Sequence, residues 1–166
     1  RLETLTELKK KNALIGIDLQ GFIRTLTEEK ILINTVWEEK KEALGLTHYL
    51  KADGVEAEFI TGEPDLITAA KLLKSYGPKE IIITHKDGVL VFDGDKIYQE
   101  PFILNKIIGR SGRGDTCGAS YAFKRLTLKP EEAIKWAAAA TSLKMESDSP
   151  LKSSYEEIEK RVEQYF

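Results

Sequence analysis

The sequence has few of the residues that build disulfide-rich domains and transition-metal sites. Cys117 is the single cysteine among 166 residues, so an internal disulfide framework and a zinc site built from cysteines are both excluded. Two histidines, His48 and His85, argue against a metal centre with several histidine ligands. We therefore expect a domain that either carries no metal or binds one through oxygen atoms.

Excess positive charge and long apolar runs are also missing. The chain has 25 Lys and Arg against 27 Asp and Glu, and a formal net charge of -2 disfavours non-specific binding to nucleic acid. No apolar run approaches the roughly 20 residues that span a bilayer. The charged opening RLETLTELKKKN lacks the apolar core of a signal peptide. We therefore expect a cytoplasmic protein with neither nucleic acid nor membrane as a partner.

Short apolar runs alternate with segments of helical periodicity along the chain. The runs predict strands at 13–18, 31–36, 48–52 and 80–84, and Asp93-Gly94-Asp95 predicts a hairpin between two further strands. Helices are predicted at 2–11, 37–44, 53–60, 64–76, 116–126, 130–144 and 153–166. Such alternation indicates one α/β unit over residues 1–166, with a mainly parallel sheet covered on both faces. Ligands of these sheets bind beyond the carboxyl ends of the strands.

A glycine-rich turn precedes the helix that we expect to begin at Thr116. Gly112, Arg113 and Gly114 let the backbone turn tightly, and the helix start offers unpaired N–H groups that attract phosphate. The spacing matches neither a P-loop nor the dinucleotide fingerprint. Asp115 is the unusual residue, because a carboxylate repels phosphate. Either it accepts a proton from a hydroxyl that attacks the phosphate, or it caps the helix.

The run GRSGRGDTCGASYAF resembles the C-terminal signature of the PfkB, or ribokinase-like, carbohydrate kinases. The resemblance implies that Asp115 is the catalytic base and that the backbone of Gly112, Arg113 and Gly114 forms an anion hole. Arg113 stands where that family usually has Ala, and Ser120 where it usually has Gly. The implied fold is a three-layer α/β/α sandwich without the N-terminal half and lid of complete members.

Two further segments resemble the family in the same order. KADGVEAEFITG resembles its Asn-x-x-Glu motif, which implies that Asp53 contributes to nucleotide binding and that Glu56 supports Mg²⁺ through water. The alternative is that Asp53 and Glu56 are simply a capping pair. IITHKDGVLVFDG resembles the strand-turn-strand that holds the nucleotide, which implies roles for Thr84, Lys86 and Gly88. A solvent-exposed Lys86 is the alternative there.

The alanines at 137–140 resemble the family helix against which adenine lies, which implies that Ala138 contacts the nucleotide, although an alanine run is also a good helix former. The resemblance as a whole implies an ATP- and Mg²⁺-dependent phosphotransferase acting on a hydroxyl of a sugar, inositol or nucleoside. A non-catalytic nucleotide-binding fragment and a structural domain capped by Asp115 are the competing hypotheses. We expect a missing N-terminal segment, or self-association, to cover the open edge of the sheet.

Overall fold

The computed structural model describes residues 2–166, which group into two compact units. Unit 1 comprises Arg1–Ile83 with Phe92–Lys96, and unit 2 comprises Thr84–Val91 with Ile97–Phe166. That residues 1–166 form a single α/β unit remains a prediction.

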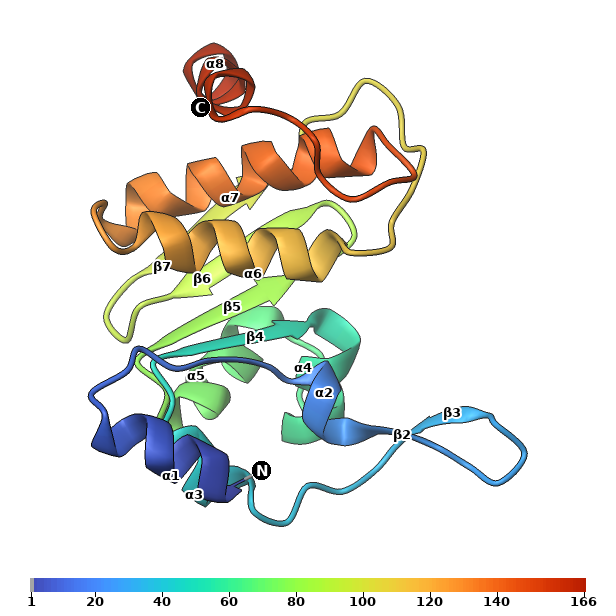
Figure 1. Cartoon of the computed structure of the whole chain (residues 1–166), viewed down its shortest axis with the longest axis vertical. Helices are drawn as coiled ribbons and strands as arrows, with labels where there is room; N and C mark the ends of the chain where they lie inside the picture. Colours follow the sequence, from blue (N-terminus) through green and yellow to red (C-terminus); the bar gives the residue numbers. More distant parts are fainter. Residues whose placement is uncertain (1) are drawn as a thin grey trace. The chain divides into compact units, whose positions relative to one another are not determined.

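Unit 1 contains the first strands and the helices around them (Figure 1). Its helices are α1 (Leu2–Lys10), α2 (Gln20–Ile23), α3 (Lys40–Gly45), α4 (Gly54–Thr61) and α5 (Leu66–Ser75). Its strands are β1 (Gly16–Asp18), β2 (Arg24–Leu26), β3 (Leu32–Asn34), β4 (Tyr49–Asp53) and β5 (Glu80–Thr84), whose last residue belongs to unit 2.

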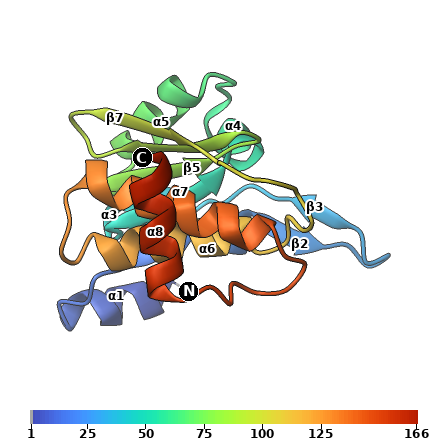
Figure 2. The same ribbon diagram turned by 90° about the horizontal axis from the view of Figure 1, so that it is seen from above.

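Unit 2 is a strand pair covered by helices. Its elements are β6 (Gly88–Phe92, of which Phe92 is grouped with unit 1), β7 (Ile97–Pro101), α6 (Arg113–Lys124), α7 (Pro130–Met145) and α8 (Tyr155–Tyr165). In Figure 2, α8 crosses over α7, where Ile158 of α8 packs with Trp136, Ala139 and Ala140 of α7. The small alanine side chains allow this close approach, and they explain why α7 is buried along most of its length.

The strands β1-β4-β5-β6-β7 form one hydrogen-bonded sheet in that order, and the predicted mostly parallel α/β fold is confirmed. The strands β1 and β4 are parallel, with Asp18 beside Lys51. Every residue of β5 and β6 is buried. This burial is why both strands read as continuous apolar runs.

The predicted strand at 31–36 exists as β3, but it lies outside the main sheet. It pairs antiparallel with β2 in a separate hairpin, in which Leu26 faces Leu32 and Arg24 faces Asn34. In Figure 1 this hairpin extends away from the helices of unit 1. A periodicity argument cannot distinguish such a hairpin from a sheet strand, because both have a period of two.

The last helix, predicted at 153–166, is α8 (Tyr155–Tyr165) and begins two residues later than predicted. Ser154, rather than Ser153, is the N-cap, and its hydroxyl accepts from the Glu157 N–H while the Glu157 carboxylate accepts from the Ser154 N–H at 2.7 Å. Consecutive serines and glutamates make both registers plausible from the sequence. Among the helices of residues 2–166, none is both long and apolar enough to cross a membrane.

Candidate functional site

The end of β4 in unit 1 carries a cluster of five charged side chains, which we call the Glu56 cluster: Asp18, Arg24, Lys51, Asp53 and Glu56. The parallel register of β1 and β4 brings Asp18 to Lys51, whose Nζ lies 3.0 Å from Asp18 Oδ2. Lys51 Nζ is also 3.8 Å from Glu56 Oε2. The β2 strand supplies Arg24, whose Nη2 lies 3.1 Å from Glu56 Oε1 and 3.8 Å from Asp53 Oδ2.

Asp53 and Glu56 form the predicted capping pair of α4. The Glu56 N–H donates to Asp53 Oδ1 at 2.8 Å, and the Asp53 N–H donates to Glu56 Oε2 at 2.8 Å. Glu56 is fully buried. Its Oε1 accepts no hydrogen bond, so Arg24 and Glu56 form an ion pair that lacks the geometry of a hydrogen bond.

Burial raises the pKa of Glu56 above its ordinary value, against the lowering effects of the Asp53 N–H and Lys51. The carboxylates of Asp53 and Asp18 raise the pKa further. One oxygen of the Glu56 carboxylate accepts a backbone hydrogen bond, and the cations Arg24 and Lys51 lie beside the carboxylate. Glu56 is therefore poorly suited to bind Mg²⁺ directly. No group of three or more His, Cys, Asp or Glu side chains within residues 2–166 is arranged to hold a metal ion.

The raised pKa of Glu56 gives a prediction about stability. The native state holds this proton more tightly than the unfolded chain, so the associated stability is present below the ordinary value of 4.5 and is lost as the pH rises through the raised native pKa. The Glu56→Gln variant carries no such proton. We expect the free energy of unfolding of the wild type, relative to this variant, to fall as the pH rises above about 4.5 in urea titrations.

The exposed Glu58 on the same helix provides the control, because Glu58→Gln should leave the pH dependence unchanged. A wild-type advantage that grows with pH would mean that the ion pairs with Arg24 and Lys51 outweigh the burial of the Glu56 carboxylate.

The glycine-rich turn of unit 2 leads into α6 three residues earlier than predicted. Gly112 is the N-cap, with a positive φ of 76° that a glycine adopts without strain. The Arg113 N–H donates to the Arg110 carbonyl at 3.1 Å. Within residues 2–166, the N–H groups of Gly112, Gly114 and Asp115 have no acceptor. The turn therefore presents three free donors, of which the Asp115 N–H was not among those predicted.

Asp115 is the third residue of α6 rather than its cap. Its side chain is exposed, and within residues 2–166 its carboxylate takes part in no hydrogen bond or ion pair. The capping interpretation of Asp115 is therefore wrong in its simple form, since Gly112 holds the cap position without a side-chain bond. An unpaired carboxylate beside free N–H groups can accept a proton from a nearby hydroxyl.

The loop before this turn is hydrogen-bonded to the C-terminal end of α7. The N–H groups of Ile108 and Gly109 both donate to the Met145 carbonyl, at 2.8 and 3.2 Å. A Cβ at Gly109 would lie 2.8 Å from the Ser147 carbonyl oxygen, so only glycine allows this approach. The position of the turn thus depends on the C-terminal end of α7.

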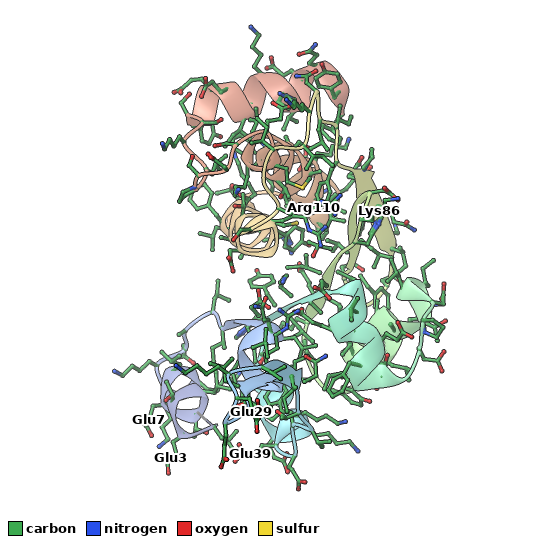
Figure 3. All side chains as sticks on the ribbon, turned by 90° about the vertical axis from the view of Figure 1, so that its right-hand side faces the viewer. Glu3, Glu7, Glu29, Glu39, Lys86 and Arg110 are labelled. Atoms are coloured by element: carbon green, nitrogen blue, oxygen red, sulfur yellow. The ribbon has the colours of Figure 1, made fainter. Side chains whose placement is uncertain are left out.

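The β5–β6 turn holds the three residues expected at the nucleotide. Thr84 is fully buried, and its hydroxyl has no hydrogen-bond partner. Lys86 is exposed and makes no interaction within residues 2–166; Figure 3 labels it in unit 2 together with Arg110, which is also exposed. A Cβ at Gly88 would lie 2.3 Å from the Glu100 carbonyl oxygen, so pairing with β7 already explains this glycine.

The same turn contains His85, for which the sequence predicts no role in the site. Burial lowers the pKa of His85; Asp87 opposes this effect and Arg113 adds to it. The imidazole therefore favours its neutral form, and its Nδ1 accepts from the Asp87 N–H at 3.4 Å. The influence of Arg113 means that the β5–β6 turn lies within electrostatic range of the start of α6.

Ala138 has an exposed fraction of 0%, as do the other alanines at 137–140. The contacts of α7 with α6, β7 and α8 account for this burial. No face of the alanine run is left for a base to lie against in this structure.

The structure thus brings the predicted residues together as two groups. Asp53 and Glu56 meet in unit 1, where they are joined by Arg24 and Lys51, and the remaining predicted residues belong to unit 2. The sequence did not predict Lys51 as a partner of Glu56. A signal was present, because Lys51 lies two residues before Asp53 on β4, and residues two apart on a strand share one face.

The glycine-rich turn, which opens a helix and carries an unpaired aspartate, belongs to an α/β fold with a mostly parallel sheet. The chain belongs to the pfkB family of carbohydrate kinases, whose model matches residues 17–156. Among curated proteins, none matches the chain.

Solved structures include a pyrophosphate-dependent kinase of the ribokinase family in complex with a pyrophosphate analogue and myo-inositol. It is 37% identical with a TM-score of 0.86, over 96% of this chain and 58% of that one. A second structure, from work on the conversion of a pyrophosphate-dependent myo-inositol-1 kinase into a myo-inositol-3 kinase, is also 37% identical, with a TM-score of 0.86. The match covers 100% of this chain and 59% of that chain. Arabidopsis thaliana ribokinase with ribose and ATP shares the fold at 21% identity and a TM-score of 0.80, over 97% and 51%. The chain spans little more than half of these proteins.

Proposed function

We propose that this chain is the donor-binding and catalytic part of a kinase that phosphorylates a hydroxyl of a small, sugar-like acceptor. The observation that carries the proposal is the exposed, unpaired Asp115 carboxylate beside the free N–H groups of Gly112 and Gly114. An anion hole and one base are chemically sufficient, because phosphoryl transfer needs mostly positioning and charge stabilisation.

In the proposed reaction, Asp115 accepts the proton of the acceptor hydroxyl as its oxygen attacks the terminal phosphorus of the donor. The bond from that phosphorus to the bridging oxygen breaks, and the bridging oxygen leaves with the remaining phosphate. The N–H groups of Gly112, Gly114 and Asp115 stabilise the negative charge on the transferred group. Mg²⁺ remains a prediction, and so does its support by Glu56 through water.

Two donors are compatible with this chemistry, and the observations favour pyrophosphate over the predicted ATP. An adenine needs an open apolar surface, and the alanines at 137–140, where the family resemblance expects it, are fully buried. Pyrophosphate has no base and requires only the glycine-rich turn. The neighbours at 37% identity are described as pyrophosphate-dependent, which supports the same choice.

The donor is tested by measuring initial rates with the gene product that contains this chain. Pyrophosphate and ATP are supplied in turn with myo-inositol, ribose or a nucleoside, and the phosphorylated product is followed by ³¹P NMR. We expect pyrophosphate to support turnover at least about tenfold faster than ATP, a difference that the loss of one favourable binding contact can produce. Faster turnover with ATP would overturn the choice of donor but leave the kinase proposal in place.

A binding module without phosphotransfer is the second candidate, and the share of the neighbours that the chain covers favours it. The chain covers 56% to 59% of the length of the pyrophosphate-dependent kinases. Within residues 2–166, β1 has a strand partner only on its β4 side. We propose that a further segment or a second copy covers this edge. Donor binding without product formation would favour the module.

A further inference from the structure

Three lysines in the structure are buried, and two of them have partners that explain their burial. Lys51, Lys124 and Lys144 have exposed fractions of 6%, 6% and 3%. Lys51 pairs with Asp18 at 3.0 Å. Lys124 donates to the Tyr155 hydroxyl at 2.6 Å and lies over the Trp136 ring at 3.5 Å. A buried cation without such partners is costly, so Lys144 needs a different explanation.

Lys144 has one acceptor where an ammonium group can use three. Its Nζ donates to the Ser147 carbonyl at 3.2 Å, and within residues 2–166 it pairs with no carboxylate and contacts no aromatic ring. The adjacent Glu146 is not available, because its carboxylate already binds Arg161 at 3.0 Å and the Asn105 N–H at 2.8 Å. The structure thus holds a buried positive charge without a counter-charge.

The unpaired charge lies beside the glycine-rich turn. A Cβ built on Gly112 would lie 3.5 Å from Lys144 Cε and 3.9 Å from Asp115 Oδ2, so both side chains border the same point. The hydrogen bonds from the N–H groups of Ile108 and Gly109 to the Met145 carbonyl hold the turn near Lys144, because Met145 follows Lys144 on α7. Lys144 therefore lies under the turn whose N–H groups are free.

We propose that Lys144 is a positioning residue for the phosphoryl donor, whose ammonium group gives the glycine-rich turn the positive charge that an anion needs there. The inference rests on the proposed function. It also accounts for the unusual Asp115, since a carboxylate beside an anion site repels the anion unless a cation offsets it. When a phosphate binds the N–H groups of Gly112, Gly114 and Asp115, Lys144 gains its missing counter-charge.

The test uses the ¹⁵N-labelled chain and inorganic pyrophosphate as the probe. Binding is followed through the amide signals of Gly112, Gly114 and Asp115, which report the turn directly. We expect Lys144→Met to weaken pyrophosphate binding by about tenfold or more, as loss of a charged contact does. Met has a similar length and suits a buried position, and Lys144→Gln provides a second variant if the Met variant fails to fold.

The buried Lys124 provides the matched control. Lys124→Met should lower the melting temperature, because it removes the Tyr155 and Trp136 contacts, but leave pyrophosphate affinity unchanged. Adding Asp115→Asn to Lys144→Met should restore part of the lost affinity, which a purely structural role of Lys144 would not predict. Wild-type affinity in both Lys144 variants would overturn the role of Lys144 alone. No pyrophosphate binding by the wild type would overturn this role together with the proposed donor site.

Discussion

Replacing Asp115 with Asn is expected to lower kcat for phosphotransfer by about 10²- to 10⁴-fold, the usual contribution of a general base. Asn has the same shape but cannot take the proton of the attacking hydroxyl. The carboxylate makes no hydrogen bond or ion pair within residues 2–166, so its removal breaks no contact that the fold needs. The KM for the donor should fall or stay unchanged, because a negative charge beside the donor phosphate is removed.

The measurement is kcat and KM with saturating acceptor, together with the melting temperature of each variant. Asp65 supplies the contrast, since it is the N-cap of α5 and accepts from the Thr68 N–H at 2.8 Å. Asp65→Ala should cost about 1 kcal/mol of stability and leave kcat unchanged. If Asp115→Asn retains kcat within threefold of the wild type, with the assay sensitive to about a tenth of the wild-type rate, Asp115 is not the base.

The sequence predicted the fold well wherever a segment had one dominant period. The buried strand β5 (Glu80–Thr84) matches its predicted range, because an uninterrupted β-branched run after Pro78 has no competing interpretation. The helix α7 begins at Pro130 as predicted, where proline at the first helical position is favoured. The capping pair of Asp53 and Glu56 was also found, as its spacing of three residues is a local signal.

The start of α6 could not be predicted to the residue. Local propensity disfavours Gly114 inside a helix and favours Asp115 as a cap, so the sequence indicated a start at Thr116. In the structure Gly112 takes the cap position with positive φ, and the helix includes Arg113, Gly114 and Asp115. This shift moves the carboxylate of Asp115 away from capping and leaves its N–H group free, which is what makes the turn a candidate site.

Long-range charge pairing was the other part that sequence reasoning could not supply. Arg24 reaches Glu56 only because the β2–β3 hairpin follows directly on α2, and no local spacing encodes that contact. Lys144 did carry a signal, since it lies seven residues after Ala137 on the buried face of α7. A lysine at such a position indicates a buried charge, but its neighbour Gly112 is known only once the chain has folded.

Gly88→Ala is expected to destabilise the protein by about 3 kcal/mol, at the upper end for overpacking, because the new Cβ would lie 2.3 Å from the backbone carbonyl oxygen of Glu100. The neighbouring strand must move, so the melting temperature should fall by about 10 °C in calorimetry. Gly45→Ala is the matched control, since a Cβ there meets nothing within 4 Å, and we expect no loss of stability. The family resemblance assigns Gly88 to the nucleotide, which predicts the opposite pattern: weaker donor binding at unchanged stability. If the Gly88→Ala protein melts at the same temperature as the wild type, pairing with β7 does not explain this glycine, and a role in donor binding is favoured instead.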